Sequence, residues 1–133
     1  MNMKRLVLTI VVVFVVSFLA GFFIHTIWLK QDYLLVASLY RPMGQEKMLF
    51  IVLAYLCFSI GSVWLYAHGV EQKPWVGQGL RFGLAMFLVT TIPWFFITYA
   101  VQPFPLILIA KIILSEGVNK IFLGLVTALL YRR

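Results

Sequence analysis

Long apolar segments without a charged residue constrain this chain more than any other feature. Leu6–Leu29 has 24 residues with no Lys, Arg, Asp or Glu, and Met48–Ala67 and Phe82–Val101 have 20 each. Because about 20 apolar residues span the hydrocarbon core of a bilayer, each segment predicts a transmembrane helix. The chain is therefore expected to use lipid as its solvent over most of its length.

A fourth segment, Phe104–Tyr131, is also apolar but contains Lys111, Glu116 and Lys120. Only helices and closed barrels satisfy every backbone hydrogen bond in lipid, and no segment alternates as a barrel strand must. The sequence predicts an all-α integral membrane four-helix bundle. It forms a single domain over residues 1–133, with helices at about 6–29, 48–68, 80–101 and 104–131.

Composition excludes several function classes. Hydrophobic residues make up 63% of the chain and charged residues 11%, against roughly 45–50% and 25% in soluble domains. A soluble enzyme, a disordered chain and a coiled coil are excluded. The sequence has no phosphate loop, zinc signature or nucleophile elbow, and its one cysteine, Cys57, cannot form an internal disulfide. We expect no catalytic activity and no cofactor, although contact with lipid or a pigment stays open, and we interpret Cys57 as a small packing residue.

Basic residues indicate the orientation of the chain. The net charge is +7, and most Lys and Arg residues lie at the ends of apolar segments, which is typical of lipid head-group contact rather than nucleic-acid binding. With the N-terminus inside, six basic residues lie on the inner side: Lys4, Arg5, Lys73, Arg81, Arg132 and Arg133. Three lie on the outer side: Lys30, Arg41 and Lys47. The bias predicts both termini on the inner side of a bacterial cytoplasmic membrane.

The first apolar segment also resembles a signal peptide, because Met1–Arg5 is basic. A signal peptide has an apolar region of about 7–15 residues and then a small-residue cleavage site. The segment here is longer and lacks such a site. It predicts a retained first helix.

The connecting segments are short. Apolar residues and tyrosines in Tyr33–Tyr40 predict a short helix in the outer interface. A polar loop at 69–79 contains Pro74 and Gly77, which we expect to break helical structure. Gln102–Pro105 predicts a tight antiparallel connection.

Polar residues in the fourth segment are its most unusual feature. At about 100° per residue, Lys111, Ser115 and Asn119 lie within about 80° of one another, and Glu116 and Lys120 follow one turn apart. The Glu precedes the Lys, as a helical ion pair prefers. An intramembrane charge is a functional-site hypothesis by default. Structural pairing or subunit contact and a transport or ligand role both stay open, as does the depth of Glu116.

Small residues form a second stripe on the same segment. Ala110, Gly117 and Gly124 recur every seven residues, about 150° from the polar face. Small residues at such spacing allow two helix backbones to approach closely. The stripe predicts a helix-packing surface.

Two histidines are candidate ligands. His25 lies near the outer end of the first helix and His68 at the inner end of the second, about 25–30 Å apart across a bilayer. They cannot bind one iron, although either could hold a metal or pigment alone. We interpret both as interfacial residues.

A proline lies within the third helix, in Thr90–Trp94. Pro93 removes one backbone hydrogen bond and predicts a kink, and Thr90 or Thr91 can satisfy the freed carbonyl groups.

Several short motifs carry a resemblance to known sequences. They are Gly21-x-x-x-His25-x-x-Trp28, Gly79-Leu-Arg-Phe-Gly83 with Pro93 and Tyr99, and Gln102-Pro-Phe-Pro105. In these motifs the chain resembles small uncharacterised four-helix membrane proteins of bacteria. The resemblance implies a bundle in the inner membrane and no established activity.

Two functions remain. The first is a non-catalytic accessory or scaffolding subunit of a larger inner-membrane complex, with other membrane subunits or a second copy as partner. It accounts for the small-residue stripe and for the charges of the fourth helix, which we expect to be uncompensated within the chain and which a partner could satisfy. The alternative is a small oligomeric transporter or channel that uses the polar face of the fourth helix. An enzyme acting on lipid ranks third.

Overall fold

The computed structural model describes residues 1–132 and confirms the all-α prediction, since no strand occurs in this range. The longer elements follow the predicted segments, with short helices between them. The elements are α1 (Met3–Phe22), η1 (Phe23–Trp28), α2 (Lys30–Tyr33), η2 (Leu34–Leu39), α3 (Met48–Gly69), α4 (Trp75–Met86), η3 (Phe87–Thr91), α5 (Ile92–Val101) and α6 (Leu106–Leu130).

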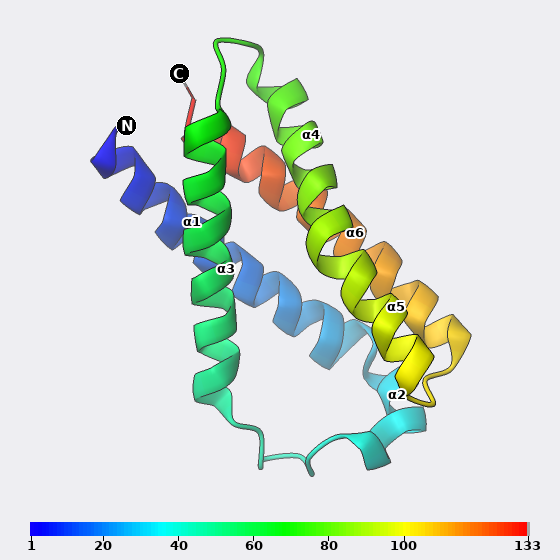
Figure 1. Ribbon diagram of the computed structural model, residues 1–133. Coiled ribbons are helices and arrows are strands. Elements are labelled where there is room, and N and C mark those ends of the chain that lie inside the picture. Colours follow the sequence, from blue (N-terminus) through cyan, green and yellow to red (C-terminus); the bar gives the residue numbers. More distant parts are fainter. Residues whose placement is uncertain (133) are drawn as a thin grey trace.

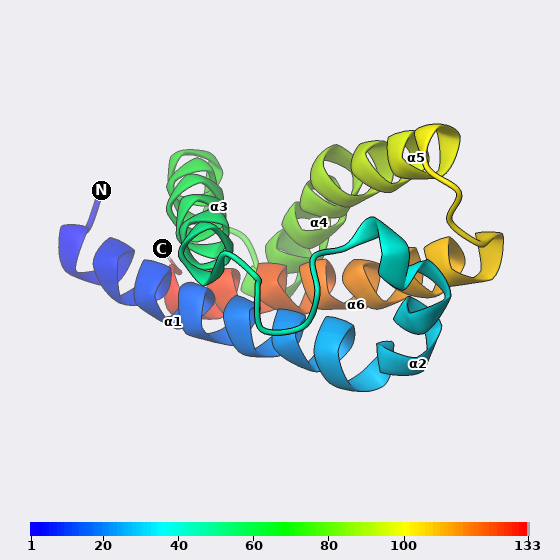
Figure 2. The ribbon, with the colours of Figure 1, turned by 90° about the horizontal axis from the view of Figure 1, so that it is seen from below.

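The helices form two layers. Helices α1 and α6 lie side by side in one layer, and α3 and the α4–α5 segment stand on the same face of it (Figure 2). α3 packs mainly on α1, whereas α4 packs along α6. The N-terminus, the C-terminal end and the α3–α4 loop lie at one end of the molecule, and α2 lies at the other (Figure 1).

Glycines allow the close contact between α4 and α6. A Cβ atom on Gly83 would lie 2.6 Å from Ile121 Cα and from the Lys120 carbonyl oxygen. A Cβ on Gly124 would overlap the backbone of Gly79 and Gly83. The stripe predicted on the fourth helix is therefore occupied at Gly124 by the chain's own α4.

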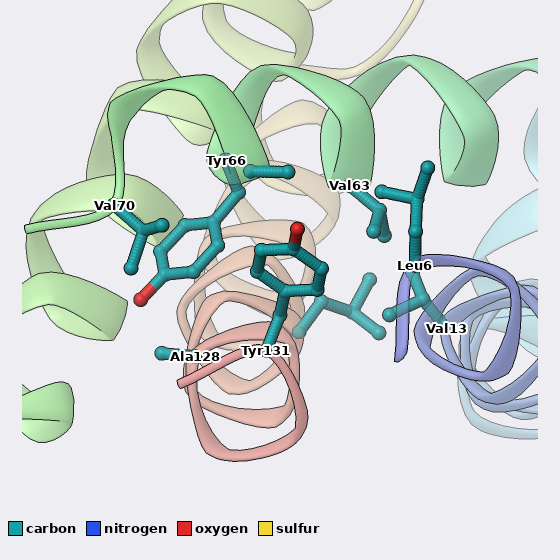
Figure 3. Close-up of a cluster of buried hydrophobic side chains, with 9 residues drawn as sticks. Leu6, Val13, Val63, Tyr66, Val70, Ala128 and Tyr131 are labelled. Carbon is teal, nitrogen blue, oxygen red and sulfur yellow. The ribbon is translucent and has the colours of Figure 1, made fainter. Parts of the chain in front are cut away.

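Two apolar clusters hold the layers together. One lies toward the end that carries the termini and joins α1, α3 and α6 through residues such as Val13, Val63 and Leu123 (Figure 3). The other lies toward α2 and includes Leu29, Leu108 and other residues of the α2, η2 and α6 region. Along α6 the segment 115–120 falls between the two clusters, which leaves the polar residues in the middle of the helix.

Three helical segments are long and apolar enough to cross a membrane: Met3–Trp28, Met48–Gly69 and Trp75–Val101. The third begins at Trp75 rather than near residue 80, so the predicted boundary was wrong. Pro74 precedes the first helical turn, where its missing N–H costs nothing, and Gly77 lies within α4 instead of breaking it.

Pro93 follows a π-helical segment, η3. The wider turn accommodates the missing backbone bond, and Thr90 Oγ1 donates a hydrogen bond of 2.7 Å to the Met86 carbonyl. Cys57 corrects another prediction, because its side chain is exposed on α3 and packs in neither cluster.

Candidate functional site

Glu116 is the centre of a polar cluster in the middle of α6. Its side chain is about 10% exposed, and both carboxylate oxygens accept hydrogen bonds. His25 Nε2 lies 2.9 Å from Oε1, and Lys120 Nζ lies 2.8 Å from Oε2. A carboxylate at this burial is stabilised by paired donors, because an isolated charge in a low-dielectric site is costly.

His25 connects Glu116 to the α2 end of the molecule. It belongs to η1, a π-helical segment, and Tyr33 Oη lies 2.6 Å from its Nδ1. Burial raises the pKa of Tyr33 well above its usual value, so the hydroxyl stays protonated and donates to Nδ1. The other ring nitrogen, Nε2, faces Glu116 Oε1, so the imidazole links the tyrosine to the carboxylate.

Lys120 is enclosed on the opposite side of Glu116. Its side chain is 13% exposed, and its ammonium lies 5.1 Å from the centre of the Phe58 ring on α3. This distance is within the range of a cation–π contact. An ammonium has three donors, and within the described residues only Glu116 accepts a hydrogen bond from Lys120.

A second ion pair lies about one and a half helical turns from Glu116 along α6, toward the end of the molecule that carries α2. Lys111 Nζ is 2.8 Å from Asp32 Oδ1 of α2, and Ser115 Oγ donates to the Lys111 carbonyl. The pair is more open than that of Glu116, since the side chain of Lys111 is 41% exposed. The expectation that the charges of the fourth helix lack partners within the chain was therefore wrong.

A cavity of about 230 Å³, here called the central cavity, lies against this cluster. Four elements form it: α1, α3, the η3–α5 segment and α6. Its lining residues are Ser17, Ala54, Tyr55, Phe58, Thr90, Thr91, Phe95, Glu116, Asn119 and Lys120. Both π-helical segments of the described chain contribute here, because Thr90 and Thr91 end η3, and His25 of η1 holds Glu116. Such segments occur frequently at functional sites.

Asn119 has an unsatisfied polar atom beside the cavity. The residue is 8% exposed, and its Oδ1 has no hydrogen-bond partner in the described chain. Buried polar side chains nearly always have a partner, and leaving one without costs about 1–3 kcal/mol. The amide can turn by 180° and present either its oxygen or its nitrogen to a group in the cavity.

The remaining sequence candidates lie outside the cluster. Gly117 faces the Phe87 ring, and a Cβ atom added to Gly117 would lie 3.1 Å from that ring. Ala110 is half-buried. His68 is exposed at the other end of α3, where its ring contacts Trp64. The described residues contain no group of three or more His, Cys, Asp or Glu side chains able to hold a metal ion.

The sequence interpretation missed two members of the site, Asp32 and Tyr33, and it named His25 as a possible ligand or interfacial residue rather than as the partner of Glu116. His25 lies one turn before the end of an otherwise apolar helix, and Asp32 is the only acidic residue among the first 45. These two features were the available signals, but their partners lie 91 and 79 residues away.

The arrangement can bind a small polar group and can transmit a change of protonation. A continuous series of hydrogen bonds runs from α2 to the central cavity through Tyr33, His25, Glu116 and Lys120.

Comparisons with protein-family models, with curated proteins and with solved structures find no match to this chain.

Proposed function

We propose that the protein is a small transport protein of the bacterial cytoplasmic membrane whose substrate site is the central cavity. The observation that carries this proposal is that Glu116, Asn119 and Lys120 line a cavity near the middle of a membrane-length helix. Intramembrane charges that serve only for packing have no need of an adjoining space. Charges that line a cavity are typical of a substrate pathway.

The proposed topology has four membrane spans. α6 has 25 residues, about 38 Å of helix, and packs along α4 within the Trp75–Val101 span. The two termini and the α3–α4 loop lie at one end (Figure 1). Lys4 and Arg5 are in the first turn of α1, Lys73 is in the α3–α4 loop, and Arg81 is in the middle of α4. By the positive-inside tendency this is the cytoplasmic end.

We prefer transport over an accessory role because the two features that suggested a partner subunit, the charges of α6 and its small-residue stripe, are accounted for by contacts within the chain. Asp32, His25 and Lys120 pair with the charges of α6, and α4 covers Gly124. Neither feature therefore requires another subunit.

The test is solute flux in liposomes that contain the purified protein. A panel of labelled amino acids, organic acids and sugars is offered to vesicles with wild-type protein, with Glu116→Gln and with Lys47→Gln. Lys47 is an exposed residue outside the cavity and serves as the matched control. We expect at least one solute class to enter faster with wild type and with Lys47→Gln than with Glu116→Gln, at equal folded yield.

Equal uptake by wild-type and protein-free vesicles for every solute would contradict the proposal. Flux that survives Glu116→Gln would contradict the assignment of the site to the α6 cluster.

An accessory subunit is the second candidate function. Within Trp75–Val101, only 6% of the 18-residue apolar stretch is buried inside the chain. The α4–α5 segment therefore presents an extended apolar face to a partner or to lipid. Purification in a mild detergent distinguishes the accessory role from transport by the protein alone. Co-purification of a fixed set of membrane subunits favours the accessory role, and an isolated small species excludes it.

A further inference from the structure

The two charged residues that line the central cavity are satisfied by contacts within the chain. One carboxylate oxygen of Glu116 bonds to His25, and the other accepts a hydrogen bond from Lys120. Glu116 and Lys120 carry opposite charges, so the pair adds no net charge to the cavity. A charged ligand would bring an uncompensated charge into a low-dielectric site, which is costly. The cavity therefore favours a ligand without net charge.

Three neutral polar residues of the central cavity, by contrast, lack partners. Tyr55, Thr91 and Asn119 line it from α3, η3 and α6. Thr91 and Asn119 are each more than nine-tenths buried. The hydroxyl groups of Tyr55 and Thr91 make no hydrogen bond to another described residue, and Asn119 Oδ1 is buried without one. Since polar groups in such positions nearly always have a partner, the three residues indicate a neutral ligand that the chain itself does not supply.

Tyr55 is held at the cavity wall by its packing on α1. Its hydroxyl lies over Gly21, where an added Cβ atom would overlap it, and its ring meets Phe18 edge to face with the ring centres 5.5 Å apart. Ser17, one helical turn before Gly21, lines the same cavity. Buried tyrosine hydroxyls usually find a hydrogen-bond partner, and this one reaches α1 without forming a bond there. The packing thus fixes the hydroxyl in place and leaves it free to bind.

Hydrogen-bond donors are numerous among the unused groups of the cavity. Lys120 uses one of its three ammonium hydrogens for Glu116. The other two, the hydroxyls of Tyr55 and Thr91 and the amide of Asn119 are all donors. A hydroxyl oxygen of a ligand accepts as well as donates, whereas a small amide such as urea has four N–H donors and one acceptor oxygen. The lining therefore fits a compound with several hydroxyl groups better than a small amide.

The remaining wall of the central cavity is apolar. It consists of Ala54 and the rings of Phe58 and Phe95. Such side chains contact the carbon atoms of a ligand, while a few polar groups fix its orientation. The volume of about 230 Å³ is below the roughly 300–1,000 Å³ of pockets that enclose drug-sized molecules, which favours a compound of few carbon atoms.

We propose that the central cavity binds a small uncharged polyol. Tyr55, Thr91 and Asn119 form hydrogen bonds to its hydroxyl groups, and the ion pair of Glu116 with Lys120 stays intact when it binds. This inference rests on the proposed transport function and names the substrate class of the same cavity.

The experiment measures ligand binding by saturation-transfer difference NMR on the protein purified in detergent without glycerol. Glycerol is titrated as the probe, and glycerate and urea are titrated as its anionic and amide counterparts. Micelles without protein give the background signal. We expect saturable binding of glycerol, with a Kd at least fivefold lower than that of glycerate or of urea.

Two conservative variants test the residues of the site. Tyr55→Phe and Thr91→Val each remove one hydroxyl group and keep the shape of the side chain, and each is expected to raise the Kd of glycerol at least threefold. Tyr99→Phe is the matched control, because Tyr99 is exposed on α5 and does not line the cavity. It is expected to leave the Kd unchanged. A Kd that is unchanged in both Tyr55→Phe and Thr91→Val would overturn the assignment of the site.

The outcomes separate this inference from the proposed transport function. Binding of glycerol without flux into liposomes would support the site and overturn transport. Flux of another solute that depends on Glu116, with no binding of glycerol, would overturn the polyol inference and leave the transport proposal standing. Binding of glycerate or urea as tight as that of glycerol would overturn the assignment to an uncharged polyol.

Discussion

Helices α3 and α6 are close in length but opposite in environment. α3 has no charged residue, and only five of its 22 residues are buried. α6 has three charged residues, and eleven of its 25 are buried. In water this distribution would be reversed. In lipid an exposed apolar side chain costs nothing, whereas an unpaired polar one costs several kcal/mol, so the polar helix occupies the interior.

The largest expected effect concerns the enclosed ion pair of α6. Lys120→Met leaves Glu116 with one donor in a buried site and is expected to cost about 3–5 kcal/mol. Lys73→Met breaks the exposed Glu71–Lys73 pair and is expected to leave the stability nearly unchanged, because solvent screens such a pair. Reversible unfolding in detergent measures both.

The double variant Glu116→Gln with Lys120→Met sharpens this prediction. It removes both charges and is expected to recover most of the lost stability, because no unpaired charge remains. A double variant as unstable as Lys120→Met would show that packing, rather than charge, governs this position.

The next effect compares one glycine from each helix. Gly124→Ala places a Cβ against the backbone of Gly79 and Gly83 and is expected to destabilise by about 1–3 kcal/mol. Gly61→Ala on α3 meets nothing within 4 Å and is expected to be neutral or to stabilise by up to about 1 kcal/mol. Thermal unfolding of the two variants side by side is the measurement. Equal midpoints would contradict the close α4–α6 contact.

The smallest effect concerns the partly exposed pair at the α2 end. Asp32→Asn weakens the bond to Lys111, and the expected loss is about 0.5–1 kcal/mol, because the side chain of Lys111 is 41% exposed. The loss should fall at high salt, since screening weakens exposed pairs. Chemical unfolding at low and at 1 M salt checks both statements.

The sequence by itself determined the type of the elements and marked three helical segments as long and apolar enough to cross a membrane. Runs of 20 or more apolar residues can satisfy their backbone in lipid only as helices, so the all-α fold followed from hydropathy alone. The polar face of α6 followed from helical periodicity, which also placed Glu116 one turn before Lys120. These properties depend on residues close together in the chain.

Only the tertiary structure decided which residues meet. His25 was interpreted as interfacial because it lies near the outer end of the first apolar segment, yet a π-helical turn and the α1–α6 packing bring it to Glu116. Asp32 and Lys111 pair for the same reason. The central cavity is a further product of packing, since its walls come from four separate elements. Sequence patterns report the period of one helix, whereas a site between helices depends on their relative position and rotation.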